Sequence, residues 1–291
     1  MNVYLSTGAF QHRSLNDIIA DCLKYNFQYL ELSSGVQYEP DLLMPVFATQ
    51  SKMNFLIHNY FPPPEDAFVL NLAAADPEIH AQSVEHCRRA IDLSRQLNAP
   101  FFSVHSGFAF YLTPEMLGDP VTQSSLPDSL YFPREQAYDI FVATVRELAD
   151  YGRQRSVKLL LENNVVSPLY LPGGENKGLL LADASEIVRC MNDLSDSNVG
   201  LLLDTGHLKV SANALRFSAE KFIEQVGSYI GAIHLSENDA MVDNNQPFSE
   251  TSWFWPFLFE FRHISWIIEV YRLDVSSMKN QISILEKCLF N

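Results

Sequence analysis

The chain has 291 residues, of which 47% are hydrophobic and 19% are charged, a composition that excludes an intrinsically disordered chain. Its formal charge of −15 argues against a protein that binds nucleic acid, because Lys and Arg contacts to phosphates supply most of the non-specific affinity in such complexes. It has no apolar run of roughly 18 residues or more, the length that crosses a bilayer, so we expect no contact with a membrane.

Short β-rich runs alternate with amphipathic stretches along the whole chain. Most of the runs are continuously apolar, as is typical of parallel strands buried on both faces. The predicted strands are Val3–Ser6, Phe27–Leu32, Asn54–His58, Phe101–His105, Lys158–Glu162, Val199–Asp204, Ile230–Leu235 and Trp266–Tyr271. The predicted helices are Ile18–Tyr25, Asp41–Thr49, Pro77–Leu97, Arg134–Arg153, Ala184–Leu194, Ala219–Tyr229, Trp255–Phe261 and Ser276–Leu289.

Eight strands, each followed by a helix, predict an α/β fold: a single (β/α)8 TIM barrel over residues 1–291. A doubly wound open sheet is disfavoured, because the turn after the first strand, Ser6–Phe10, has no GxGxxG pattern. Two connections are long, Gly107–Pro133 and Val165–Leu181. Both follow strand ends, where barrels keep their active sites, and we expect the first to act as a lid.

The four cysteines lie far apart in helical patterns, and none forms a CxxC pair. The segment Met1–Gly8 has neither the basic region nor the long apolar stretch of a signal peptide. Free thiols and a cytoplasmic protein are therefore expected.

Six consecutive predicted strands, the third to the eighth, each deliver a His, Asp or Glu near their ends. These residues are His58, His105, Glu162, Asp204 with His207 just after it, His234 and Glu269. The ends of parallel barrel strands converge on one mouth, so we expect the side chains to meet there. Buried, unpaired carboxylates and imidazoles are costly to desolvate, and a divalent cation such as Zn²⁺, Mn²⁺ or Co²⁺ offsets that cost. The sequence thus predicts a metal site at the C-terminal mouth of the barrel.

On these residues the sequence resembles the xylose isomerase-like barrels, a superfamily that includes sugar isomerases, sugar epimerases and endonuclease IV. The metal set of the sugar epimerases is implied at Glu162, Asp204, His234 and Glu269. Endonuclease IV-like members add two histidines, matched by His58 and His105, and a DTxH element, matched by Asp204-Thr205-Gly206-His207. Asn71–Ala73 and Asp243–Pro256 also look like segments of that family.

One departure from endonuclease IV concerns the third zinc. The Asp-x-His element after the seventh strand reads Asp243-Asn244-Asn245 here, and the following Gly-Glu-Gly reads Ser249-Glu250-Thr251. An amide oxygen is a far weaker zinc ligand than imidazole nitrogen, so we expect one or two bound ions.

The favoured hypothesis is a metal-dependent enzyme that isomerises or epimerises a small sugar or sugar phosphate through a metal-stabilised enediolate. The resemblance implies that Glu162 and Glu269 transfer the proton, and His207 could hold a substrate oxygen. Asn163, Asp243 and Arg272 are candidate substrate-binding residues, although an ordinary salt bridge would also account for Arg272.

Three alternatives stay open. One is an endonuclease IV-like phosphoesterase acting on abasic-site DNA or a smaller phosphate ester, which His58 and His105 favour and Asn245 and the negative charge oppose. Another is a sugar or inosose dehydratase, and the third is a barrel that binds a ligand without catalysis. The aromatic residues around Phe108 and Phe110 could stack on a sugar, but packing or a homodimer surface explains them more simply.

Overall fold

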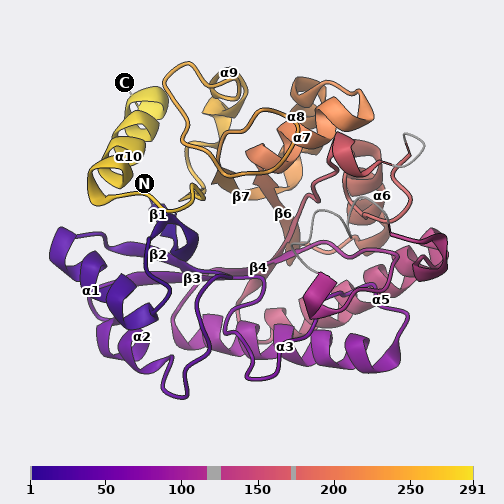
Figure 1. Ribbon diagram of the computed structural model, residues 1–291, viewed down its shortest axis with the longest axis horizontal. Coiled ribbons are helices and arrows are strands. Elements are labelled where there is room, and N and C mark those ends of the chain that lie inside the picture. Colours follow the sequence, from indigo (N-terminus) through magenta and orange to yellow (C-terminus); the bar gives the residue numbers. More distant parts are fainter. Residues whose placement is uncertain (1, 117–125, 172–174, 291) are drawn as a thin grey trace.

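The computed structural model describes residues 2–116, 126–171 and 175–290. Eight parallel strands pair in sequence order, and the first also pairs with the last, so that the sheet closes into a barrel (Figure 1). The strands are β1 (Val3–Ser6), β2 (Tyr29–Leu32), β3 (Asn54–His58), β4 (Phe101–His105), β5 (Lys158–Glu162), β6 (Val199–Asp204), β7 (Ile230–Leu235) and β8 (Ser265–Ile268). The predicted (β/α)8 barrel is confirmed.

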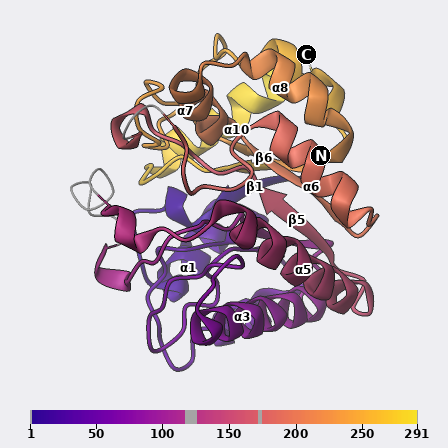
Figure 2. The same ribbon diagram turned by 90° about the vertical axis from the view of Figure 1, so that its right-hand side faces the viewer.

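Helices surround the strands in chain order (Figures 1 and 2). They are α1 (Leu15–Tyr25), α2 (Met44–Thr49), α3 (Pro77–Gln96), α5 (Arg134–Arg153), α6 (Ala184–Leu194), α7 (Thr205–Leu215), α8 (Ala219–Val226), α9 (Trp255–Leu258) and α10 (Val275–Phe290). The start of α3 shows ordinary capping chemistry: the Asp76 side chain accepts hydrogen bonds from the backbone N–H groups of Glu78 and Ile79, and Pro77 occupies the first turn.

Helix α7 was not predicted, and its absence from the prediction is an error. The helix begins directly after β6, because the Asp204 side chain accepts a hydrogen bond from the backbone N–H of His207 at 2.7 Å. Asp204 thus ends a strand and caps a helix at once, leaving no loop to mark the boundary. Two strands also differ in their limits: β2 begins at Tyr29, and β8 begins at Ser265 and ends at Ile268, one residue before Glu269.

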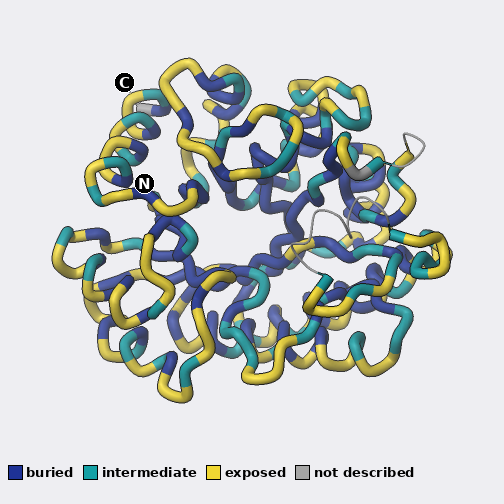
Figure 3. The backbone as a smooth tube through the Cα atoms, viewed as in Figure 1, coloured by how far each residue is buried: buried dark blue, intermediate teal, exposed yellow. Residues whose placement is uncertain are grey.

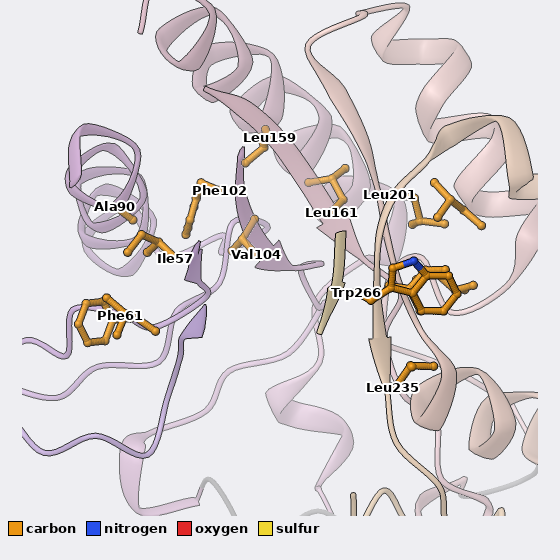
Figure 4. Packing of buried hydrophobic residues seen from close by; sticks show 14 of the residues in the cluster. Ile57, Phe61, Ala90, Phe102, Val104, Leu159, Leu161, Leu201, Leu235 and Trp266 are labelled. Atoms are coloured by element: carbon orange, nitrogen blue, oxygen red, sulfur yellow. The ribbon is translucent and has the colours of Figure 1, made fainter. Parts of the chain in front are cut away.

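Apolar side chains form two separate layers of core. The larger lies between the strands and the helices and includes Phe102, Leu161, Leu201 and Trp266 (Figure 4). The smaller fills the inside of the barrel and consists of Tyr4, Leu56, Ala99, Phe101, Leu160, Leu202, Ala232 and Ile267. In Figure 3 the strands are accordingly buried, and exposed residues lie on the outer helices and loops.

The positions of the inner-core residues along the strands also determine which polar residues face the barrel interior. Side chains two positions apart along a strand point to the same face, so each residue two places after an inner-core residue also faces the barrel interior. Leu160 is followed in this way by Glu162, and Leu202 by Asp204. The apolar layer is therefore a floor, with a polar layer above it at the C-terminal mouth.

The cysteines are free thiols, as predicted, and three of the four are buried: Cys22, Cys87 and Cys190. Among the helices of the described residues, none is long and apolar enough to cross a bilayer.

Candidate metal centre

The polar layer brings all six predicted metal ligands together. Three overlapping groups of side chains have ligand atoms within 4.8 Å of one another. They are Glu162 with Asp204, His234 and Glu269; Glu162 with His58 and His105; and His58 with His234 and Glu31. Glu162 belongs to the first two groups, so its carboxylate lies between the epimerase-like set and the pair of histidines.

The Glu162 carboxylate is buried and lies close to three histidines. Its side chain is 1% exposed, and its Oε2 lies 3.4 Å from His58 Nε2 and 3.2 Å from His105 Nε2. Its Oε1 lies 3.4 Å from His207 Nδ1. None of these approaches has hydrogen-bond geometry, and neither carboxylate oxygen has a hydrogen-bond partner among the described residues.

Two further buried atoms at the same place make no hydrogen bond of good geometry within the described part of the chain, although charged groups lie near them. They are Asp204 Oδ2 and His234 Nδ1. Native proteins rarely leave buried polar groups unpaired, and carboxylate oxygens and imidazole nitrogens are the ligands that Zn²⁺ and Mn²⁺ take. The residues present therefore fit a divalent cation.

The carboxylates of the cluster do not titrate alike. Burial opposes the ionisation of Glu162, but His105 and His58 outweigh it and hold its pKa well below the usual value. The pKa of Asp204 is likewise lowered, since His207 and His234 together outweigh burial. Glu269 differs: burial, reinforced by the negative charges of Asp204 and Glu162, raises its pKa to about 7 despite His234.

Glu31 is a member of the cluster that the sequence analysis missed. It is fully buried at the end of β2, and its Oε1 lies 3.0 Å from His234 Nε2. On the other side of the same ring, Nδ1 lies 2.9 Å from Glu269 Oε2. Glu31 therefore fixes the orientation of the His234 ring and directs Nδ1 into the cluster. A signal was present, because Glu31 is the sole charged residue of the second predicted strand.

His207 is held by contacts on both ring nitrogens. Its Nδ1 lies 2.8 Å from the Asn163 carbonyl oxygen, and its Nε2 lies 3.2 Å from Asp243 Oδ2. Asp243 is thereby placed beside the cluster. The side chain of Asn245 is buried, and its Nδ2 has no hydrogen-bond partner among the described residues.

Two predicted substrate-binding residues have other surroundings than expected. The Asn163 side chain donates a hydrogen bond to the Asp204 carbonyl and accepts one from the Asp204 N–H, so contact with substrate would have to replace one of these bonds. Arg272 is exposed, and no described residue pairs with its guanidinium. Its contact with an anionic substrate group stays a prediction.

A cavity of about 760 Å³ opens beside the cluster, lined by the segments that follow β3, β4 and β5. His105 and Asp243 lie on its wall, and the half-exposed His105 side chain thus faces both the cluster and the cavity. The predicted lid, Gly107–Pro133, includes residues 117–125, which lie outside the described residues. The start of that segment is fixed by backbone hydrogen bonds: Ala109 N–H donates to Gly178, and Phe132 N–H to Ala109.

The sequence model of the xylose isomerase-like TIM barrel matches residues 22–267. The chain belongs to this family. The resemblance drawn from the strand-end residues is therefore confirmed.

A relative within the family is the "Probable endonuclease 4" of Thermoplasma acidophilum, 29% identical over 176 residues. The match covers 59% of this chain and 50% of the relative, so the chain spans about half the length of the curated protein it matches. Solved structures of similar fold include a D-tagatose 3-epimerase-like protein, with a TM-score of 0.73, 18% identity and coverage of 99% of this chain and 97% of the other. A Thermus thermophilus protein soaked with ZnCl2 has a TM-score of 0.61 and 16% identity, and 99% of each chain is covered. At these identities the structures show a shared fold.

Proposed function

We propose that the chain is a divalent-metal-dependent isomerase or epimerase of a sugar. The observation that carries the proposal is the buried group formed by Glu162, Asp204, His234 and Glu269, whose ligand atoms lie within 4.8 Å of one another and are in part unpartnered among the described residues. The solved structure of a D-tagatose 3-epimerase-like protein, which has the same fold over 99% of this chain, supports it.

A divalent cation bound to this group would polarise a carbonyl and a neighbouring hydroxyl of the substrate and so acidify the C–H bond of the carbon that bears the hydroxyl. Glu162 and Glu269 come from β5 and from the end of β8 and face the same space. One of the two, as a carboxylate, takes the proton from carbon, and the other, in its protonated form, gives a proton to the opposite face; the centre is inverted and the two groups exchange protonation states, with no net gain or loss of atoms. Before a cation binds, the two carboxyl groups differ in protonation, because the pKa of Glu269 is about 7 and that of Glu162 is held well below its usual value.

His207 completes the site from α7. Its contacts with the Asn163 carbonyl and Asp243 hold the ring at the edge of the cluster. From there its role is to orient a substrate oxygen.

The test is the appearance of solvent deuterium at one carbon of a sugar incubated with the Mn²⁺- or Zn²⁺-loaded protein. Glu269→Gln removes a proton-transfer group and should slow this exchange by about 10²- to 10⁴-fold. The matched control is Glu220→Gln, on the exposed face of α8, which should exchange at the wild-type rate. Near-normal exchange by Glu269→Gln would show that the two-carboxylate mechanism is wrong.

A second candidate is hydrolysis of a phosphate ester by a metal cluster. The group of His58, His105 and Glu162 favours it, as does the likeness to an endonuclease 4 sequence. Cleavage of abasic-site DNA or of a small phosphodiester by the metal-loaded protein, without deuterium exchange into sugars, would select this function over the epimerase.

A further inference from the structure

The cavity beside the metal cluster is larger than a monosaccharide needs. Its volume of about 760 Å³ lies in the range of sites that hold drug-sized ligands, roughly 300–1,000 Å³. His105 and Asp243, which contact the cluster, line the cavity together with Phe110 and Tyr131. A ligand whose reactive end lies at the cluster therefore has room for a substituent beyond it.

Part of the cavity lining is aromatic. Phe108 and Phe110 stack with ring centroids 4.6 Å apart, and Tyr131 lies edge-on to Phe110 at 5.5 Å. Tyr60 and Phe68, from the segment after β3, form a second aromatic pair in the lining, with centroids 5.4 Å apart. We call these five residues the aromatic wall.

The part of the aromatic wall formed by Phe108, Phe110 and Tyr131 is built in advance of any ligand. Ala109 N–H donates to Gly178 at 2.8 Å, and Phe132 N–H donates to Ala109 at 3.1 Å, which ties the segment after β4 to its neighbours. Gly178 is required by the packing, because an added Cβ would lie 2.4 Å from the Phe110 ring. A wall held in place in this way loses little conformational entropy when it binds.

The cavity offers little to hold a phosphate. The fully charged side chains in its described lining are Lys177, Glu175 and Asp243, and no arginine of the described residues lines it. The Lys177 ammonium already pairs with Asp128 at 3.2 Å. Phosphate sites use arginine forks, free lysines or clustered backbone N–H groups, and two carboxylates repel an anion.

We propose that the aromatic wall binds an uncharged aromatic or other apolar group carried by the substrate at the end remote from its carbonyl–hydroxyl pair. The substrate is then a sugar bearing an apolar substituent, neither a free monosaccharide nor a sugar phosphate. This inference rests on the proposed function, which it deepens by naming the substrate class. It also gives the aromatic residues after β4 a binding role that the sequence alone did not favour.

The test compares four ligands that share one carbonyl–hydroxyl pair: D-fructose, 6-O-methyl-D-fructose, 6-O-benzyl-D-fructose and D-fructose 6-phosphate. Their affinities for the metal-loaded wild-type protein are measured by titration calorimetry, and deuterium exchange is followed in parallel. Transfer of a benzyl ring from water onto the aromatic wall should make the benzyl ether bind about 10- to 100-fold more tightly than the methyl ether. The phosphate should bind no better than the methyl ether.

Two variants locate the effect. Phe110→Ala, with its folding checked by circular dichroism, should remove most of the benzyl preference and leave the affinity for the methyl ether unchanged. Phe259→Ala, a 52% exposed phenylalanine after α9 and outside the cavity, is the matched control and should keep the preference.

Failure of this inference and failure of the proposed function give different results. Equal affinities for the methyl and benzyl ethers, tightest binding of the phosphate, or no binding of the benzyl ether would overturn the inference, whatever the exchange shows. A benzyl preference without deuterium exchange in any of the four ligands would uphold the binding site and overturn the proposed isomerase or epimerase.

Discussion

Glu269 shares its buried space with the carboxylates of Glu162 and Asp204, and of these three groups it alone has a raised pKa. In the metal-free protein the charges of Asp204 and Glu162 add to burial in raising its pKa from 4.5 to about 7. A carboxyl whose pKa is higher in the folded state binds more protons folded than unfolded, so its ionisation destabilises the fold. The penalty is absent below about pH 4.5, grows as the pH rises to about 7, and is fully present above that.

Glu269→Gln should therefore stabilise the protein after metal removal. At pH 8 we expect its free energy of unfolding to exceed that of the wild type by on the order of 2 to 3 kcal/mol, with the difference shrinking toward pH 4.5. Urea denaturation in the presence of a chelator measures both values across this range. If the wild type were more stable than the variant at pH 8, Asp204 and Glu162 would not destabilise ionised Glu269.

Glu31 acts on the metal site through His234. Its Oε1 lies 3.0 Å from Nε2 of that ring, while Nδ1 of the same ring faces Glu269. Partners of this kind orient a ligating histidine and raise its basicity, and their loss typically costs roughly 10- to 100-fold in metal affinity. We expect a loss of about this size for Glu31→Gln, measured by Zn²⁺ or Mn²⁺ titration.

The control for Glu31 is Glu224→Gln, an exposed carboxylate on α8, which should bind metal as the wild type does. If Glu31→Gln and the control had equal affinities, Glu31 would serve the fold alone.

At the scale of the elements, Asp204 couples β6 and α7 to the site. One of its carboxylate oxygens accepts the His207 N–H and caps α7, while the other is buried without a hydrogen bond among the described residues. An Asn side chain keeps a good capping oxygen, whereas Ala keeps none. The two roles of Asp204 can therefore be separated by substitution.

Asp204→Asn and Asp204→Ala should both weaken metal binding, but they should differ in stability. In metal-free protein we expect the Ala variant to be less stable than the Asn variant by about 1 kcal/mol, the usual value of an N-cap. Thermal or urea unfolding compares them directly. Equal stabilities would mean that the cap contributes nothing to the start of α7.

At the scale of the whole molecule, we expect the binding of a metal ion to stabilise the fold. A cation that binds only the folded protein, present at roughly 1,000 times its dissociation constant, adds about 4 kcal/mol to the free energy of unfolding. A cation would bind only the folded protein here, because the candidate ligands come from β3 to β7 and from the residue after β8. They come together only in the closed barrel.

The number of ions distinguishes the two candidate functions. We expect one or two per chain, since Asn245 stands where endonuclease IV-like proteins have histidine and leaves a third ion with His207 and Asp243 alone. Elemental analysis of protein purified without chelator gives the count. Three tightly bound zinc ions together with cleavage of abasic-site DNA would favour the nuclease.

Much of the metal centre could be predicted from the sequence, because parallel barrel strands end at one mouth. Apolar runs that finish in His58, Glu162 or Asp204 predict both the strands and the place where their polar ends meet. The strand-end residues can be predicted to lie together without any measured distance, because a closed parallel barrel brings all its strand ends to one mouth. The order of strands and the family follow from the same local pattern.

Only the tertiary structure decided the rest. Glu31 belongs to the site because its β2 position faces His234 across the barrel, 203 residues away in the chain. The charge state of Glu269 depends on its distance from Asp204 and Glu162, and the cavity depends on how the segments after β3, β4 and β5 pack on one another. Local sequence determines strand, helix and which side chains share a face. Electrostatic fields and cavity shape arise from distances between segments remote in the chain, which folding alone sets.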